Sequence, residues 1–116
     1  MKRLLPAIGL IVGAAILAAC NEPSGGNTCA STGANPINAR NDSTFEPPSL
    51  QVQITEKFCF QNLGSLTHTI TSDSAADSID VTLPPNFTFT RAYGRQRDFN
   101  YHCRFHAGMA GVVHVR

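Results

Sequence analysis

The sequence predicts an all-β fold, a small antiparallel β-sandwich, and three observations lead to that class. Helical periodicity is absent, short runs of β-prone residues recur between turn signals, and apolar residues alternate within several of these runs. Seven or so short strands joined by turns are typical of a sandwich. The core of such a domain is small, so a disulfide and a bound metal would both help it stay folded.

The folded domain is expected to span residues 43–116, with its first large apolar residue at Phe45. Its first strand, "SLQVQIT" at 49–55, alternates in polarity, which places one set of side chains on a common face: Leu50, Val52 and Ile54. The chain of 116 residues has room for one such domain.

Six further strands are expected before the chain ends. "KFCFQN" at 57–62 places Phe58 and Phe60 on one face and Cys59 on the other. The corner "LPPN" at 83–86 separates strands, because proline interrupts strand pairing. The remaining strands are "HTITS" at 68–72, "SIDVTL" at 78–83, "FTFT" at 87–90, "DFNYHC" at 98–103 and "GVVHV" at 111–115.

The N-terminal segment has the layout of an export signal. Lys2 and Arg3 precede an apolar run over residues 4–19 that is short for a stable membrane span. The residues "LAAC" at 17–20 resemble a bacterial lipobox, which implies cleavage after residue 19 and acylation of Cys20. An uncleaved N-terminal anchor helix is the alternative. Both place the domain outside the cytoplasm, on a bacterial membrane, at its periplasmic or outer face.

Residues 20–42 are expected to form the lipidated cysteine and a flexible tether. The segment is rich in Asn, Ser, Gly, Thr, Ala and Pro and has few large apolar side chains. Such a composition buries too little surface to offset the entropy lost on ordering. Cys29 could pin the middle of the tether to the domain.

The charge of the chain argues against nucleic acid as a partner. Loss of Lys2 and Arg3 with the signal leaves 7 of the 9 basic residues against 8 acidic ones, whereas nucleic-acid binding calls for a strongly basic surface. The charges cluster, and each cluster is either solvated surface or a docking patch. The clusters are Asp73, Asp77 and Asp80 on one side, and Arg91, Arg95, Arg97, Arg104 and Arg116 on the other.

The four cysteines divide into three roles. With Cys20 assigned to lipid and Cys103 to a metal, Cys29 and Cys59 remain as a candidate disulfide in an oxidising compartment. This bond would close a loop of about 30 residues and contribute roughly 3 kcal/mol in the chain-entropy picture. The sequence leaves open whether these two cysteines approach each other.

The segment "YHCRFHAGMAGVVHV" at 101–115 suggests a metal site. Cys103, His106 and Met109 follow one another at steps of three, beside the turn-forming Gly108. The turn can bring all three side chains to one end of the sandwich, where a fourth ligand must come from another loop. His68, at the start of an expected strand, is the natural candidate.

Copper is the metal that suits this ligand set. Two imidazoles, a thiolate and a thioether are the ligands of a blue copper centre. Zinc more often takes a second cysteine or a carboxylate, and iron–sulfur clusters need more thiolates than are free here. His102 and His114 are expected to point outward, while Phe99 and Tyr101 pack beneath the site.

The folded part of the chain resembles the cupredoxins of the plastocyanin–azurin group, most closely the amicyanin type with its short ligand loop. "FEPPSLQV" at 45–52 resembles the opening strand of the family, "HTITSD" at 68–73 its first-histidine segment, and "YHC-x-x-H-x-x-M-x-G" at 101–111 its ligand loop. The resemblance implies a Greek-key sandwich with one copper ion that cycles between Cu(I) and Cu(II).

Three departures from the family pattern concern the surroundings of the metal. Arg104 and Phe105 stand where amicyanin has threonine and proline, and Thr69 replaces an asparagine that braces the cysteine loop. Thr69 could supply a hydroxyl and a backbone group instead. Thr55 and Glu56 replace a glycine-containing turn. None of these changes removes a ligand.

These observations lead to the hypothesis of a lipid-anchored, monomeric electron carrier that shuttles single electrons between redox partner proteins. By family resemblance the exposed edge of His106 is the route of the electron, within a docking patch formed by Arg104, Phe105, Ala107 and Ala110. Arg104 and the other late arginines would orient an acidic partner.

Two other classes of function stay open. One is copper binding for transport or storage, against which stands the scarcity of methionine, since Met109 is the only one left after removal of the signal. The other is a metal-free adhesion sandwich. An enzyme is not expected, because a site with four ligands has no open position for a substrate and the chain is too short for a second copper cluster.

Overall fold

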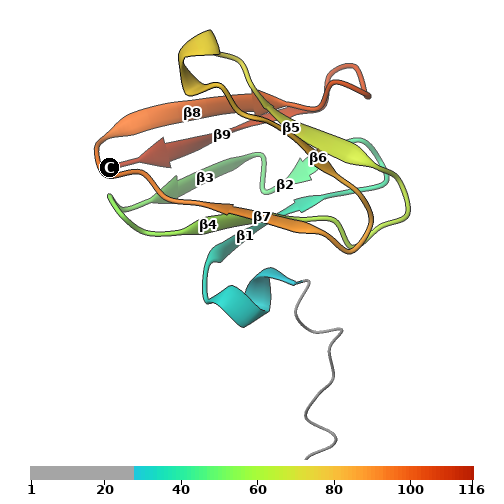
Figure 1. Cartoon of the computed structure of the whole chain (residues 1–116), viewed down its shortest axis with the longest axis horizontal. Coiled ribbons are helices and arrows are strands. Elements are labelled where there is room, and N and C mark those ends of the chain that lie inside the picture. Colours follow the sequence, from blue (N-terminus) through green and yellow to red (C-terminus); the bar gives the residue numbers. More distant parts are fainter. Residues whose placement is uncertain (1–27) are drawn as a thin grey trace, which may run out of the picture.

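The computed structural model describes residues 28–116 as a β-sandwich with two short 3-10 helices (Figure 1). No helix within this range is long and apolar enough to cross a membrane. The elements in chain order are η3 (Cys29–Thr32), β1 (Asn35–Ala39), β2 (Phe45–Glu46), β3 (Ser49–Val52), β4 (Phe58–Gln61), β5 (His68–Ser72), η4 (Ala75–Asp77), β6 (Asp80–Leu83), β7 (Thr88–Arg91), β8 (Arg97–His102) and β9 (Ala110–Val115).

The strands form two sheets that lie face to face, as Figure 1 shows. One sheet has the order β2-β1-β4-β7 and the other the order β3-β9-β8-β5-β6. The predicted all-β sandwich is therefore confirmed. It is not purely antiparallel, because β1 runs parallel to β4 and β3 runs parallel to β9. The chain passes from one sheet to the other between β2 and β3, where Pro47 and Pro48 supply no N–H groups for strand pairing.

The expectation of a tether up to residue 42 is wrong for its second half. β1 (Asn35–Ala39) lies between β2 and β4 in the four-stranded sheet, and it buries Ile37 and Ala39. A strand that alternates needs few apolar residues, and its ladder to β4 supplies the remaining stabilisation, so composition alone underestimates such a segment. The domain thus begins before residue 43. The expected signal at 1–19, the lipidation of Cys20 and the tether up to residue 27 lie outside the described residues.

A disulfide joins Cys29 to Cys59 and attaches the N-terminal segment to the four-stranded sheet. Both cysteines are fully buried and form a small second core with Ala34. The backbone N–H of Cys29 donates to Gln61 Oε1 at 2.7 Å, and Gln61 Nε2 donates to Asn38 Oδ1 at 2.6 Å. In Figure 1, η3 accordingly lies against the outer face of this sheet.

Aromatic side chains fill the space between the sheets. Phe58 and Phe60 project into the core from β4, as the alternation predicted, and Tyr101 enters it from β8. The Tyr101 ring meets the ring of Phe60 edge-to-face, with 4.8 Å between centroids, an arrangement that aromatic pairs favour. Ile54 differs from the prediction: β3 ends at Val52, and Ile54 lies in the following turn with 40% of its surface exposed.

Candidate metal centre

Three elements place the predicted ligands at the same end of the sandwich. His68 is the first residue of β5 and pairs with Leu83, the last residue of β6. Cys103 directly follows β8, which runs antiparallel to β5. The loop between β8 and β9 then carries His106. Antiparallel pairing therefore joins two segments that are 35 residues apart in the chain.

Hydrogen bonds within the loop keep it tight. The N–H of Cys103 donates to the carbonyl of Met109 at 2.9 Å, and the N–H of Met109 donates to the carbonyl of His106 at 3.2 Å. Gly108 closes this turn with a φ of +82°, in the left-handed region where only glycine is at ease. The spacing of three between the candidate ligands thus follows from a compact turn.

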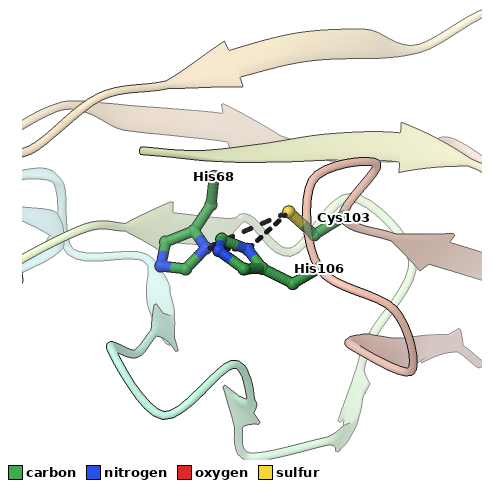
Figure 2. Close-up of side chains that lie close together, drawn as sticks. All are labelled: His68, Cys103 and His106. Carbon is green, nitrogen blue, oxygen red and sulfur yellow. Dashed lines mark hydrogen bonds between the residues drawn. The ribbon is translucent and has the colours of Figure 1, made fainter. Parts of the chain in front are cut away.

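The donor atoms of three side chains converge on one point (Figure 2). His68 Nδ1 lies 3.2 Å from His106 Nδ1, and Cys103 Sγ lies 3.9 Å from the first nitrogen and 3.4 Å from the second. Donors bound to one ion at about 2.0–2.3 Å have separations of this size. Among the described residues, this is the group of His, Cys and carboxylate side chains arranged to hold a metal.

Burial differs between the three donors. His68 is fully buried and Cys103 is 4% exposed, whereas His106 is partly exposed. Burial holds the pKa of His68 below its ordinary value, and the charge of His106 adds to this, while the backbone carbonyl of Arg40 acts in the opposite direction. His68 therefore stays neutral and able to bind a metal at pH values where an exposed histidine takes up a proton.

Met109 lies beside this group. Its side chain is 1% exposed, packs in the same core cluster as Cys103, and lines the same open cavity as Cys103 and His106. A soft thioether next to a thiolate and two imidazoles suits copper better than a hard cation. The residues present thus fit copper, and His68, Cys103 and His106 form a candidate copper site.

Thr69, the residue after His68, contacts the ligand loop at two points. Its N–H donates to Cys103 Sγ at 3.3 Å, and its hydroxyl accepts a hydrogen bond from the N–H of Arg104 at 2.8 Å. One fully buried threonine therefore contacts both the sulfur and the residue after it. Thr69 thus braces the ligand loop through its hydroxyl and its backbone N–H.

Asn62 is a supporting residue that sequence reasoning missed. Its side chain donates to the carbonyl of Leu66 at 2.7 Å and to that of Leu83 at 2.9 Å, and accepts from the N–H of Gly64 at 3.0 Å. These bonds hold the loop that leads into His68. The only signal in the sequence is an asparagine placed just before a glycine-containing turn, a pattern that many loops share.

The other histidines lie away from the three donors. His102 Nδ1 lies 2.6 Å from Asp73 on the surface, and His114 Nδ1 lies 2.8 Å from Asp98. Of the proposed docking residues, Phe105 is 52% exposed, and Ala107 and Ala110 are exposed as well.

Two ion pairs connect the two charge clusters. Arg104 Nε lies 2.9 Å from Asp80 Oδ1, and Arg97 forms an ion pair with Asp77. The acidic and basic clusters that the sequence shows thus partly neutralise one another, and Arg104 is not a free cation.

Solved structures similar to this chain include amicyanin variants and a purple cupredoxin. A reduced amicyanin variant superposes with a TM-score of 0.65 at 19% identity, covering 73% of this chain and 84% of that one. An oxidised amicyanin variant gives 0.67 at 17% identity, covering 76% and 87%. A purple cupredoxin from Nitrosopumilus maritimus gives 0.60 at 18% identity, covering 71% and 99%.

Sequence comparison adds no relative: no protein-family model matches the chain, and no curated protein matches it. The likeness is therefore one of architecture. Together with the position of the His68, Cys103 and His106 cluster at one end of the sandwich, it establishes that this chain has the cupredoxin fold.

Proposed function

We propose that this protein is a single-copper electron carrier whose ligands are His68, Cys103, His106 and Met109. The observation that carries the proposal is the convergence of two imidazole nitrogens and one sulfur, 3.2 to 3.9 Å apart, with His68 and Cys103 buried. When bound, copper supplies a one-electron change between Cu(I) and Cu(II). The residues supply a fixed geometry in which few atoms have to move.

The surroundings support rapid electron exchange. His68 and Cys103 are held by strand pairing and by the contacts of Thr69, so they are positioned before any metal arrives. Apolar neighbours and soft sulfur donors favour the reduced ion and raise the potential. The protein thus contributes to electron transfer by keeping the ligand atoms in nearly fixed positions.

His106 is the proposed exit for the electron. It is the partly exposed member of the cluster. Phe105 and Ala107 in its loop and Ala110 at the start of β9 are exposed as well. Redox encounters are small and weak, so a modest apolar contact beside a ligand is sufficient. Arg104 lies at the rim and pairs with Asp80, but both side chains are exposed, so the charge of Arg104 can still act on an acidic partner. In that case Arg104→Glu should slow reduction by that partner in a salt-dependent way.

We also propose that the carrier is monomeric and exported, with an acylated Cys20 that holds it at a bacterial membrane near its redox partners. The support for this lies in the lipobox-like "LAAC" and in the disulfide between Cys29 and Cys59, since structural disulfides persist in oxidising compartments. Enzyme activity is not part of the proposal.

Optical and electron paramagnetic resonance spectra of the copper-loaded protein test the proposal. We expect an intense sulfur-to-copper charge-transfer band that bleaches on reduction and returns on oxidation. Cys103→Ser should abolish this band. His68→Gln should strongly weaken or shift it, while His114→Gln, which alters a histidine outside the cluster, should leave it unchanged.

The alternative function, copper transport or storage without a redox task, predicts a different result. A colourless protein that releases copper readily to a chelator would contradict the electron carrier and support that alternative. The burial of Cys103 and Met109 argues for slow release, because exchangeable copper needs accessible ligands.

A further inference from the structure

We propose that Thr71 and Asp80 are positioning residues of the copper site, acting through a closed ring of hydrogen bonds that holds the backbone on both sides of the ligand cluster. This inference rests on the proposed function for its link to copper. The ring itself is a property of the protein without metal, and it can be tested there.

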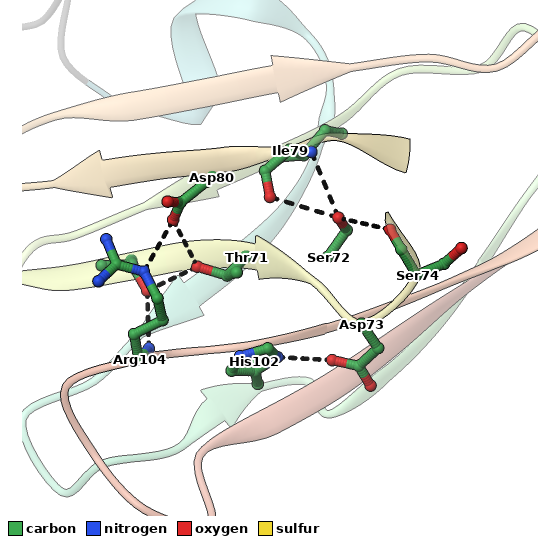
Figure 3. Close-up of polar contacts among 9 residues, drawn as sticks. Thr71, Ser72, Asp73, Ser74, Ile79, Asp80, His102 and Arg104 are labelled. Carbon is green, nitrogen blue, oxygen red and sulfur yellow. Dashed lines mark hydrogen bonds and ion pairs between the residues drawn. The ribbon is translucent and has the colours of Figure 1, made fainter. Parts of the chain in front are cut away.

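The ring has four members. The N–H of Arg104 donates to Thr69 Oγ1 at 2.8 Å, and Thr69 Oγ1 lies 3.0 Å from Thr71 Oγ1. The hydroxyl of Thr71 donates to Asp80 Oδ1 at 2.8 Å. The same oxygen accepts from Arg104 Nε at 2.9 Å, so the path that began at the backbone of Arg104 ends on its side chain. Figure 3 shows Thr71 and Arg104 reaching Asp80 from different segments.

Proton counting fixes the direction of every bond in the ring. A hydroxyl has one hydrogen to donate, and that of Thr71 is used on the carboxylate of Asp80. Thr71 must therefore accept from the hydroxyl of Thr69, which in turn accepts from the N–H of Arg104. All donors point toward the negative charge, an arrangement in which successive hydrogen bonds strengthen one another.

Strand geometry explains why these side chains meet. Thr69 and Thr71 lie two residues apart on β5, so they share a face of the sheet, and Asp80 is the direct partner of Thr71 on β6. The ligand loop crosses this face at Arg104 and buries Thr69. Pairing of β5 with β6 thus places the carboxylate of Asp80, which lies outside the ligand loop, within hydrogen-bonding distance of Arg104 in that loop.

The ring acts on the ligands through their neighbours in the chain. Thr69 follows His68, and Arg104 follows Cys103, so the bond between Thr69 and Arg104 ties the two ligand-bearing segments together. Thr69 also donates its own N–H to Cys103 Sγ. If Thr71 is absent, the buried hydroxyl of Thr69 loses its acceptor, and both contacts lose their fixed orientation.

The charge state of Asp80 agrees with this role. Hydrogen bonds from Arg104, and then from Thr71, hold the pKa of Asp80 below its ordinary value. Asp73 provides a contrast on the same side of the molecule: its carboxylate pairs with His102, and within residues 28–116 no side-chain hydrogen bond joins it to a threonine. Figure 3 shows the two pairs as separate contacts.

Amide hydrogen exchange of the copper-free protein is the first test. Thr71→Val keeps the shape and charge of the residue but removes the hydroxyl. We expect the N–H of Arg104 to exchange about tenfold faster, since the partly buried hydrogen bond that orients the hydroxyl of Thr69 is lost. Thr71→Ser restores the hydroxyl and should restore slow exchange. An unchanged rate in Thr71→Val would overturn the ring.

A charge-matched pair is the second test. Asp80→Ala and Asp73→Ala each remove one exposed carboxylate on the same side of the molecule, but only the first cuts the ring. We expect about threefold faster exchange at Arg104 in Asp80→Ala, the effect of one exposed ion pair, and parental exchange in Asp73→Ala. Equal effects of the two substitutions would reduce the role of Asp80 to general surface charge and overturn the proposal.

The copper-loaded proteins complete the experiment. Thr71→Val should shift the sulfur-to-copper absorption and the reduction potential, Thr71→Ser should not, and both should bind copper in equal amount. If exchange changes as expected but spectrum and potential stay constant, the ring exists without positioning the site, and the proposal fails. If the parent protein shows no such absorption at all, the proposed function fails, while the exchange data still decide whether the ring forms.

Discussion

Tyr101 has an unusual position at the scale of single residues. It is fully buried two residues before Cys103, and its hydroxyl makes no hydrogen bond within the part of the chain that the structure describes. Burial raises the pKa of Tyr101 well above its ordinary value. The hydroxyl is accommodated because residue 111 on the neighbouring strand is glycine, which leaves room for it.

Gly111→Ala should therefore destabilise the protein. A Cβ at this position would overlap the hydroxyl of Tyr101 and lie 2.9 Å from the carbonyl oxygen of Pro48. Overpacking of this kind costs about 1–3 kcal/mol. Denaturant midpoints measure the effect. Gly94→Ala is the control, since a Cβ there has no atom within 4 Å and should leave the midpoint nearly unchanged.

The pKa of His68 gives the copper-free protein a specific pH dependence. The unfolded chain takes up a proton at this histidine near pH 6.5, about the ordinary histidine value, whereas burial keeps the folded form neutral to lower pH. Protons thus bind preferentially to the unfolded state, and the free energy of unfolding should fall as the pH drops below about 6.5.

Urea denaturation between about pH 8 and pH 5 measures this dependence. His68→Gln should flatten the slope within this window. Carboxylates such as Asp98, whose pKa is lowered by hydrogen bonds from His114 and Arg116, contribute stability that is lost only at more acidic pH. A parental midpoint that does not change between pH 7 and pH 5 would contradict the assignment.

At the scale of elements, β1 and η3 depend on contacts with distant parts of the chain. β1 obtains its ladder from β4, and η3 is held by the disulfide and by the amide of Gln61. Neither segment carries enough apolar surface to be stable alone. This part of the sandwich is therefore where a covalent bond matters most.

Replacement of both Cys29 and Cys59 by alanine should lower the free energy of unfolding by about 3 kcal/mol, the entropy of a loop of that length. We also expect the backbone N–H of residue 29 to exchange rapidly in this double variant. Without the disulfide, no covalent bond holds this N–H close to its acceptor, Gln61 Oε1. Reduction of the parent protein should have a similar effect on stability. Slow exchange at residue 29 in the double variant would show that the amide contact suffices without the disulfide.

At the scale of the whole molecule, exposed apolar side chains gather at the end that carries the candidate copper site. Within the described chain, four of the five large exposed apolar residues lie in the loops next to His68 or in the ligand loop, and the fifth, Ile54, lies near the end of β3, by Tyr93 and Arg116. The four are Leu63, Leu66, Phe87 and Phe105. Such a distribution favours contact through the end where His106 is partly exposed.

Electron self-exchange between oxidised and reduced copper-loaded protein tests whether molecules meet through the copper end, and it needs no other protein as a partner. Phe105→Glu places like charges opposite each other when two molecules meet at the copper end, and we expect the rate to fall at least about tenfold. Ile54→Glu adds the same charge at the other end and should have little effect. Equal rates in the two variants, measured by NMR line broadening, would contradict contact through the copper end.

Much of the site could be predicted from the sequence, because its signals are local. The alternation in β4, β5 and β8 predicts strands, and the spacing of Cys103, His106 and Met109 predicts a tight turn that carries a thiolate, an imidazole and a thioether. His68 required one further step, namely that the fourth ligand comes from another loop at the same end of the sandwich. These inferences depend on neighbours in the chain, for which periodicity and residue type are sufficient.

The tertiary structure decided what depends on residues far apart in the chain. It shows that residues 35–39 form a strand although their composition is that of a linker, that Cys29 meets Cys59, and that Thr69 takes over the bracing of the ligand loop. It also joins Asp80 to Arg104 through two threonines. Hydrogen bonds and charges act over a few ångströms in space, so their partners are determined by strand pairing rather than by any pattern along the sequence.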